Sequence, residues 1–278
     1  MSKSKDMSFL DQLEELRWHL IRSVISILIF GFIAFLAKEI IFDIIIFGPK
    51  KGDFISYKLF CSISQSFGGD AFCFNELPFR VQSRTVSGQF SAHLWTSILA
   101  GFIIAFPYII WEFWKFISPG MYKNEKDGAK GFIFISSLLF FIGVLFGYYI
   151  VTPLSINFLG SYTVSNEVFN DFDWASYVGL LRSSVLASGI IFEIPIIVHY
   201  LTKVGIVTPD FLKRNRKFAL VIVLSLSAII TPPDIASQII VSIPILILYE
   251  ISIIISKIGF KKLNNWYLFY DLKGTWNF

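Results

Sequence analysis

The sequence predicts an all-α integral membrane protein with six transmembrane helices and both termini in the cytoplasm. Three observations support this prediction. First, 55% of the 278 residues are hydrophobic and only 16% are charged, whereas soluble domains carry about 25% charged residues. Second, the apolar residues gather in runs long enough to cross a bilayer. Third, lysine and arginine are distributed unevenly between the connecting loops, which indicates the orientation.

Six predominantly apolar runs are candidate spans, because about 17–25 such residues cross the hydrocarbon core. The runs are Leu20–Ala37, Ser91–Trp111, Gly131–Val151, Ala175–Leu201, Phe218–Ile230 and Ile235–Ile255. The first run exceeds the apolar core of a signal peptide, and no small-residue cleavage site follows it. We therefore expect it to be retained as a span.

The basic residues predict which loops face the cytoplasm. Lysine and arginine gather in the loops 112–130 and 202–217 and after the last run, whereas the loop 152–174 has none. Because basic residues mark cytoplasmic loops, the loops 38–90 and 152–174 are expected outside. The chain then divides into a cytoplasmic N-terminus (1–19), a six-span membrane domain (20–256) and a cytoplasmic tail (257–278).

The fifth run stops early, at the stretch SAIITPPDIASQ. Its 13 residues, Phe218–Ile230, make only ~20 Å of helix, against a hydrocarbon core of about 30 Å. Pro232 and Pro233 cannot continue the helix. We expect short spans five and six, joined as a tight helical hairpin.

The segment SFLDQLEELRWHL, before the first run, has the pattern of an amphipathic helix. Apolar residues recur on one helical face, at Phe9, Leu13, Leu16 and Leu20. We expect this helix to lie at the cytoplasmic interface, with Glu15 presented to the cytoplasm. A solvated face without a ligand is the alternative.

A second cytoplasmic carboxylate, Glu125, lies in the loop segment ISPGMYKNEKDG. Arginine forms charge-assisted, often bidentate bonds to carboxylates, and lysine cannot reproduce that geometry. Glu15 and Glu125 could together bind a pair of guanidinium groups. A mixed-charge loop without a ligand is the alternative.

Glu193, in GIIFEIPIIV, lies inside the fourth run. A carboxylate at that depth is costly and usually faces a cavity or a partner; the alternative is a protonated carboxyl that is hydrogen-bonded internally. Glu250 and Arg182 are weaker candidates, since Arg182 can snorkel to the outer interface. Thr231 and Gln238 offer hydrogen bonds to a partner helix.

Cys61 and Cys73 both fall in the outer loop 38–90. Disulfides persist outside a bacterial inner membrane, so we expect a bond between them, with two unpaired thiols as the alternative. Two cysteines and three histidines exclude a Cys/His metal cluster. Hydrolase, metalloprotease and P-loop motifs are missing, so we expect neither enzymatic activity nor a cofactor or metal.

Four segments, in order, resemble the TatC family of the twin-arginine protein translocase. They are LEELRWHL near the N-terminus, WKFISPGMYKNEK in the first cytoplasmic loop, FEIP in the fourth run and TPPDIASQ before the sixth. The similarity covers about residues 8–256. Two positions differ from the family pattern: its histidine falls at Gln12, and its second arginine falls at His19.

The resemblance implies a receptor in the bacterial inner membrane that binds twin-arginine signal peptides of folded cargo. TatA-type and TatB-type single-span proteins would be its partners in an oligomeric complex, without nucleic acid, and the proton-motive force would drive transport. Glu15 and Glu125 would bind the arginine pair, with Arg17, Phe116 and Pro119 shaping the surface.

The resemblance also implies roles for residues in and above the membrane. Thr231 and Gln238 match positions associated with partner docking, and Glu193 would line a concave intramembrane face. Pro49 matches a proline of the outer cap.

Two other functions were considered. A proton-coupled small-solute transporter using Glu193 would need a polar pathway and often shows an inverted repeat, and the sequence shows neither. A membrane-embedded enzyme is disfavoured because the catalytic motifs are missing.

Overall fold

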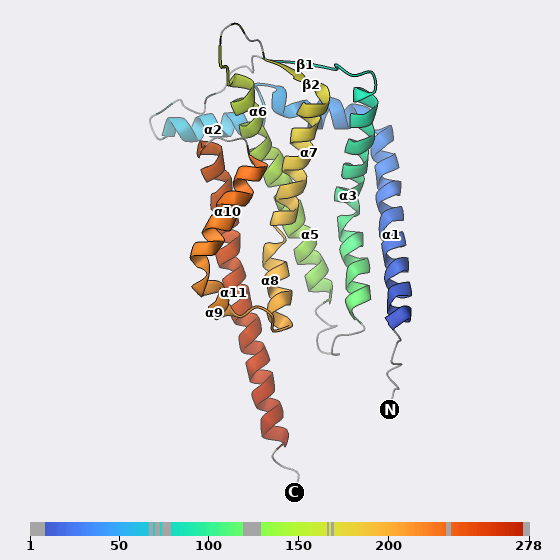
Figure 1. Cartoon of the computed structure of the whole chain (residues 1–278), viewed down its shortest axis with the longest axis vertical. Coiled ribbons are helices and arrows are strands. Elements are labelled where there is room, and N and C mark those ends of the chain that lie inside the picture. Colours follow the sequence, from blue (N-terminus) through green and yellow to red (C-terminus); the bar gives the residue numbers. More distant parts are fainter. Residues whose placement is uncertain are drawn as a thin grey trace.

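The chain folds as a bundle of long helices that run side by side (Figure 1). The computed structural model describes residues 9–66, 69, 73, 79–118, 129–165, 167, 170–231 and 235–274. Five helical segments in this part are long and apolar enough to cross a membrane. They are Gln12–Leu36, Gly88–Ile117, Gly131–Ser161, Trp174–Lys203 and Ser237–Gly259. The predicted class, an all-α integral membrane protein, is confirmed.

The first two spans are the antiparallel helices α1 (Phe9–Leu36) and α3 (Gly88–Ile117). They approach closely where Gly31 faces Gly101: a Cβ atom added to Gly101 would lie 2.5 Å from the backbone nitrogen of Gly31. Small residues allow such close approach of membrane helices. One detail differs from expectation. The amphipathic N-terminal segment is not a separate interfacial helix, because α1 runs without a break from Phe9 into the span.

Short elements cover the end of the bundle opposite the beginning of α1 and the end of α11 (Figure 1). They are η1 (Ile40–Ile46), η2 (Gly48–Lys50), α2 (Ile55–Ser66), β1 (Arg80–Gln82) and β2 (Asp171–Asp173). We call them the cap. The strands pair in parallel, with Arg80 opposite Asp171. These elements lie in the segments predicted as the outer loops 38–90 and 152–174.

Buried hydrogen bonds attach the cap to the bundle. Tyr57 is buried and donates from its hydroxyl to the carbonyl oxygen of Pro49, at 2.7 Å, and burial raises the pKa of Tyr57. Tyr177 of α7 donates to the carbonyl oxygen of Ile46, at 2.9 Å. Pro49 itself is buried in η2. Within the cap, a disulfide joins Cys61 and Cys73.

The third and fourth spans are built from several segments. The third comprises α5 (Ala129–Phe146), the π-helical turn η4 (Gly147–Val151) and α6 (Thr152–Ser161), so it extends into the predicted loop 152–174. The fourth comprises α7 (Trp174–Ile191) and α8 (Ile194–Lys203). The break between α7 and α8 follows from Pro195, in the first turn of α8, because proline lacks the N–H that would continue the helix.

The remaining helices are α9 (Pro209–Arg214), α10 (Arg216–Ile230) and α11 (Ile235–Gly274). Helix α10 has 15 residues, or ~22 Å, as the early stop of the fifth run predicted. The expectation that span six is also short is wrong, because α11 has 40 residues and extends beyond the bundle. No proline follows Pro244 to end it.

Candidate functional site

The N-terminal part of α1 and the C-terminal part of α3 meet around a buried carboxylate, Glu112. The Glu112 side chain is 1% exposed, and its Oε2 lies 2.6 Å from Nδ1 of His19 and 3.6 Å from Nη1 of Arg22. Lys115, one turn further along α3, places its Nζ 3.1 Å from Oε1. A buried carboxylate is tolerated when it is paired and hydrogen-bonded. Glu112 therefore joins α1 to α3.

Glu15 lies one helical turn before His19 on α1, so the two share a face. Glu15 is half-buried, and it makes no ion pair with any residue that the structure describes. The ring of Phe116 meets the ring of His19 edge-on, with centroids 6.2 Å apart. His19 thus connects the turn carrying Glu15 with the turn carrying Phe116.

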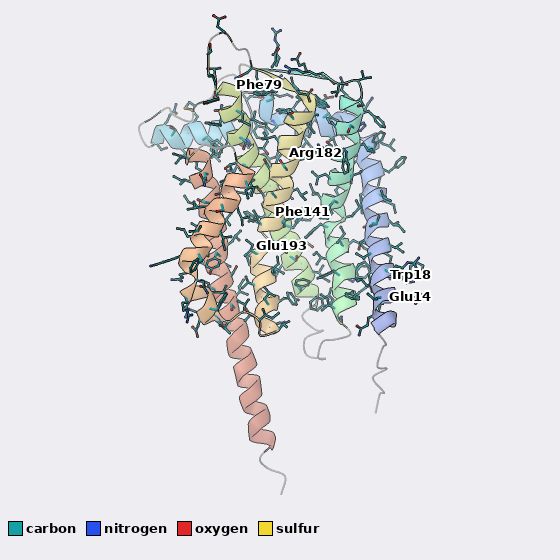
Figure 2. The ribbon with its side chains drawn as sticks, viewed as in Figure 1. Glu14, Trp18, Phe79, Phe141, Arg182 and Glu193 are labelled. Atoms are coloured by element: carbon teal, nitrogen blue, oxygen red, sulfur yellow. A yellow bond between two sulfur atoms is a disulfide. The ribbon has the colours of Figure 1, made fainter. Side chains whose placement is uncertain are left out.

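The other residues predicted for this surface are distributed differently. Arg17 is exposed. Figure 2 shows Glu14 and Trp18 on the side of α1 that faces away from α3, and both are exposed. Pro119 and Glu125 lie outside the described residues.

Glu112 was missed in the sequence reasoning, although a signal was present. It is a carboxylate near the end of an apolar run, three residues before Lys115, and helical neighbours at that spacing pair. Its partner His19 stands where the resembling family has arginine. A basic residue at position 19, at the start of an apolar run, indicates an acidic partner on a neighbouring span.

The intramembrane carboxylate Glu193 lies at the break between α7 and α8, near the middle of the bundle (Figure 2). The hydroxyl of Ser136, on α5, donates to its Oε2 at 2.6 Å. Its Oε1 has no hydrogen-bond partner among the described residues. Because Glu193 is only 9% exposed, the carboxylate is enclosed between helices rather than displayed on an open face.

Thr231 and Gln238 flank the turn between α10 and α11. The Thr231 hydroxyl donates to the carbonyl oxygen of Ser227 at 2.8 Å, and the Gln238 amide donates to that of Leu224 at 3.0 Å. Both donors are therefore used within the hairpin, and the second one clamps α11 to α10. At the other end of α10, Arg216 pairs with Glu250 at 2.7 Å.

Known proteins resemble this chain over almost its whole length. A family model described as "Sec-independent protein translocase protein (TatC)" matches residues 11–244. The chain belongs to the TatC family. A TatC of Blattabacterium is 42% identical over 257 residues, covering 92% of this chain and 97% of that protein. A TatC of Desulforapulum autotrophicum is 35% identical over 263 residues, covering 94% and 89%.

Solved TatC structures share the fold. A crystal structure titled "Twin Arginine Translocase Receptor- TatC" superposes with a TM-score of 0.67 at 33% identity, covering 89% of this chain and 99% of that one. A second structure of that receptor, in DDM, gives a TM-score of 0.68 at 34% identity, covering 88% and 99%. As a TatC-family protein, the chain is a multi-pass subunit of a protein translocase in the bacterial inner membrane.

The site combines two carboxylates in different environments. Among the described residues, no three His, Cys, Asp or Glu side chains gather closely enough to hold a metal ion. The site presents one carboxylate, Glu15, without an ion pair among the described residues, and a second, Glu112, that is paired with His19, Arg22 and Lys115. Such a surface can bind cations on a ligand.

Proposed function

We propose that this protein is the signal-peptide receptor of a twin-arginine translocase. It binds the signal peptides of folded cargo proteins at the cytoplasmic ends of α1 and α3. It recruits TatA-type and TatB-type single-span proteins within the membrane, and the proton-motive force drives translocation. The name of the structural relative, a twin-arginine translocase receptor, supports this proposal.

The observation that carries the proposal is the contrast between two carboxylates. Glu112 is buried and paired with His19, Lys115 and Arg22. Glu15 is half-buried without an ion pair among the described residues. A guanidinium group of the ligand can therefore bind Glu15 without displacing an internal cation. Glu125 binds the second guanidinium, and Arg17, Phe116 and Pro119 shape the surface around the pair.

Recognition of arginine rather than lysine follows from the geometry of the guanidinium group. Its planar array of N–H donors matches the two oxygens of a carboxylate, whereas the ammonium group of lysine acts as a point charge. A pair of carboxylates on ordered elements then selects two adjacent arginines over two lysines.

Partner recruitment uses the hairpin of α10 and α11. Helix α10 is too short to cross a bilayer of ordinary thickness, and thinning of the membrane beside it relieves such a mismatch. A single-span partner docks there, where the Oε1 of Gln238 accepts a hydrogen bond. Glu193 takes part in the transport step rather than in peptide binding.

Binding of synthetic signal peptides to the detergent-solubilised protein tests the receptor function. Wild type is compared using peptides that carry Arg-Arg or Lys-Lys. We expect about tenfold tighter binding of Arg-Arg, or ~1.4 kcal/mol, and loss of this preference in Glu15→Ala and Glu125→Ala. Glu14→Ala is the matched control, since Glu14 is exposed on a different face of α1, and it keeps the preference. Wild-type binding that is blind to the arginine pair contradicts the proposal.

A further inference from the structure

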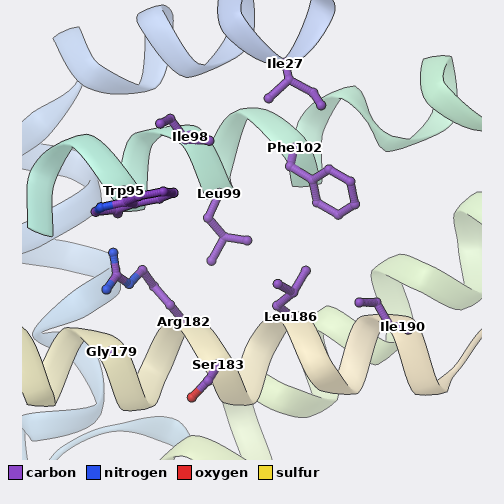
Figure 3. A pocket seen from close by; sticks show the side chains of 10 residues that line it. All are labelled: Ile27, Trp95, Ile98, Leu99, Phe102, Gly179, Arg182, Ser183, Leu186 and Ile190. Atoms are coloured by element: carbon purple, nitrogen blue, oxygen red, sulfur yellow. The ribbon is translucent and has the colours of Figure 1, made fainter. Parts of the chain in front are cut away.

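A groove opens between α1, α3 and α7 (Figure 3). None of the residues that line it belongs to the proposed peptide site or to the α10–α11 hairpin. Its volume is about 630 Å³, within the range of about 300–1,000 Å³ that small-molecule sites occupy. Helix α3 contributes Trp95, Leu99 and Phe102, and α7 contributes Arg182, Leu186 and Ile190. The lining is apolar except for Ser183 and one charged group, the Arg182 guanidinium.

The charged end of the groove lies on the cap side of the membrane. Arg182 is eight residues into α7 and Trp95 is seven residues into α3, so both lie about 10–12 Å along helices that start at the cap. Ile190 lies eight residues further along α7, or ~12 Å. The groove is therefore close to one leaflet in length, since half of the hydrocarbon core is about 15 Å.

Arg182 carries a positive charge within a membrane span. No carboxylate lies within ion-pair distance of Arg182 in the described part of the chain. Its side chain points into the groove, toward Trp95 (Figure 3), and it is half-buried. Arginine within a membrane span is costly and usually finds an anionic or polar partner. The guanidinium charge of Arg182 is therefore expected to bind an anion that enters the groove from the cap-side leaflet.

We propose that an anionic phospholipid of the outer leaflet binds in this groove. Arg182 binds its phosphate through paired N–H donors, the geometry in which arginine recognises phosphate. One acyl chain lies against Leu99, Phe102 and Leu186. Trp95 and Ile190 are 60% and 52% exposed, so the groove is open to lipid along its side.

The dimensions favour a lipid over a partner helix. The groove extends ~12 Å along α7 from Arg182 to Ile190, close to the depth of one leaflet, whereas a spanning partner helix would need a contact surface along most of the ~30 Å hydrocarbon core. An acyl chain is much narrower than a helix and fits.

Quenching of Trp95 fluorescence by brominated lipids tests the proposal. The protein is placed in nanodiscs with increasing fractions of brominated phosphatidylglycerol or brominated phosphatidylcholine, and a Trp95→Phe variant defines the contribution of Trp95. We expect half-maximal quenching at about tenfold lower fraction of the anionic lipid. Arg182→Gln removes this preference. Arg80→Gln is the matched control and keeps the preference for the anionic lipid. Arg80 is exposed on β1 of the cap and does not line the groove, so this substitution removes the same charge elsewhere.

A competition experiment between lipids tests the proposal with the wild-type protein alone, so its result does not depend on whether a variant folds. Unlabelled phosphatidylglycerol should relieve the quenching, and inorganic phosphate should not. Equal quenching by the two lipids, or loss of the preference in Arg80→Gln, overturns the proposal. A photo-crosslinker at Leu99 that traps protein in place of lipid in cells also overturns it, because a partner chain then covers the groove.

Discussion

Glu112 illustrates how a single residue can hold two spans together without contacting a ligand. Its carboxylate is buried between His19 of α1 and Lys115 of its own helix. Replacing the carboxylate with an amide of the same shape leaves these basic side chains without their carboxylate partner. We expect Glu112→Gln to lower the free energy of unfolding by about 2 kcal/mol, measured by thermal or denaturant unfolding in detergent.

The control for this change is Glu14→Gln, because Glu14 is exposed and makes no ion pair among the described residues, and its stability should match that of wild type. Glu112→Gln should keep its preference for Arg-Arg peptides where it is folded. A variant of normal stability that no longer distinguishes the peptides would show that Glu112 itself contacts the ligand.

The Glu193 carboxylate is enclosed, and among the described residues only its Oε2 has a hydrogen-bond partner, the hydroxyl of Ser136. Glutamine at this position can still accept that hydrogen bond, but it cannot carry a charge or exchange a proton. We expect Glu193→Gln to bind signal peptide with wild-type affinity and to impair export. Peptide binding is measured in vitro, and export is measured in cells with a folded twin-arginine reporter protein. Unchanged export in Glu193→Gln would show that the carboxylate is not needed for transport.

Between elements, the helices α1 and α3 cross in close backbone contact at Gly31 and Gly101. A methyl group on Gly101 would lie 2.5 Å from the carbonyl oxygen of Ile27 and 2.5 Å from the nitrogen of Gly31. Backbone cannot move aside as a flexible side chain does, so the helices must separate. We expect Gly101→Ala to destabilise the protein by about 1–3 kcal/mol, seen as a lower unfolding temperature.

The chain supplies a matched control for this substitution. A Cβ atom added to Gly131, at the start of the third span, meets no heavy atom within 4 Å, so Gly131→Ala should be neutral or slightly stabilising because alanine favours helix. Equal stability of the Gly101→Ala and Gly131→Ala variants would contradict the close packing of α1 against α3.

At the scale of the whole molecule, the cap lies at the opposite end of the bundle from the beginning of α1 and the end of α3, where peptide binding is proposed (Figure 1). The disulfide between Cys61 and Cys73 closes a loop of 12 residues in the cap, which corresponds to ~3 kcal/mol of stabilisation in the chain-entropy model. We expect reductant to lower the unfolding temperature of wild type and to leave peptide binding intact. Cys61→Ser should behave like reduced wild type and be insensitive to reductant; loss of binding on reduction would show that the two ends are coupled.

Much of the architecture followed from local patterns. Long apolar runs predicted the spans, because lipid leaves the backbone no partner except its own helix. The pair Pro232 and Pro233 predicted the end of the short α10, and Pro195 predicted the irregularity beside Glu193. These features depend on residues that are neighbours in sequence. Accordingly, the class of the protein and the order of its spans were determined by the sequence alone.

Only the tertiary structure decided what the charged groups contact. His19 and Glu112 are 93 residues apart, and Ser136 and Glu193 are 57 apart, so no periodicity within a helix could pair them. The pairing of β1 with β2 and the groove around Arg182 likewise depend on which surfaces meet. The sequence determined which segments enter the membrane, because that choice is made by local hydrophobicity. Packing determined which carboxylates are neutralised and which stay open to a ligand, because the free energy of a buried charge depends on neighbours that are distant in the chain.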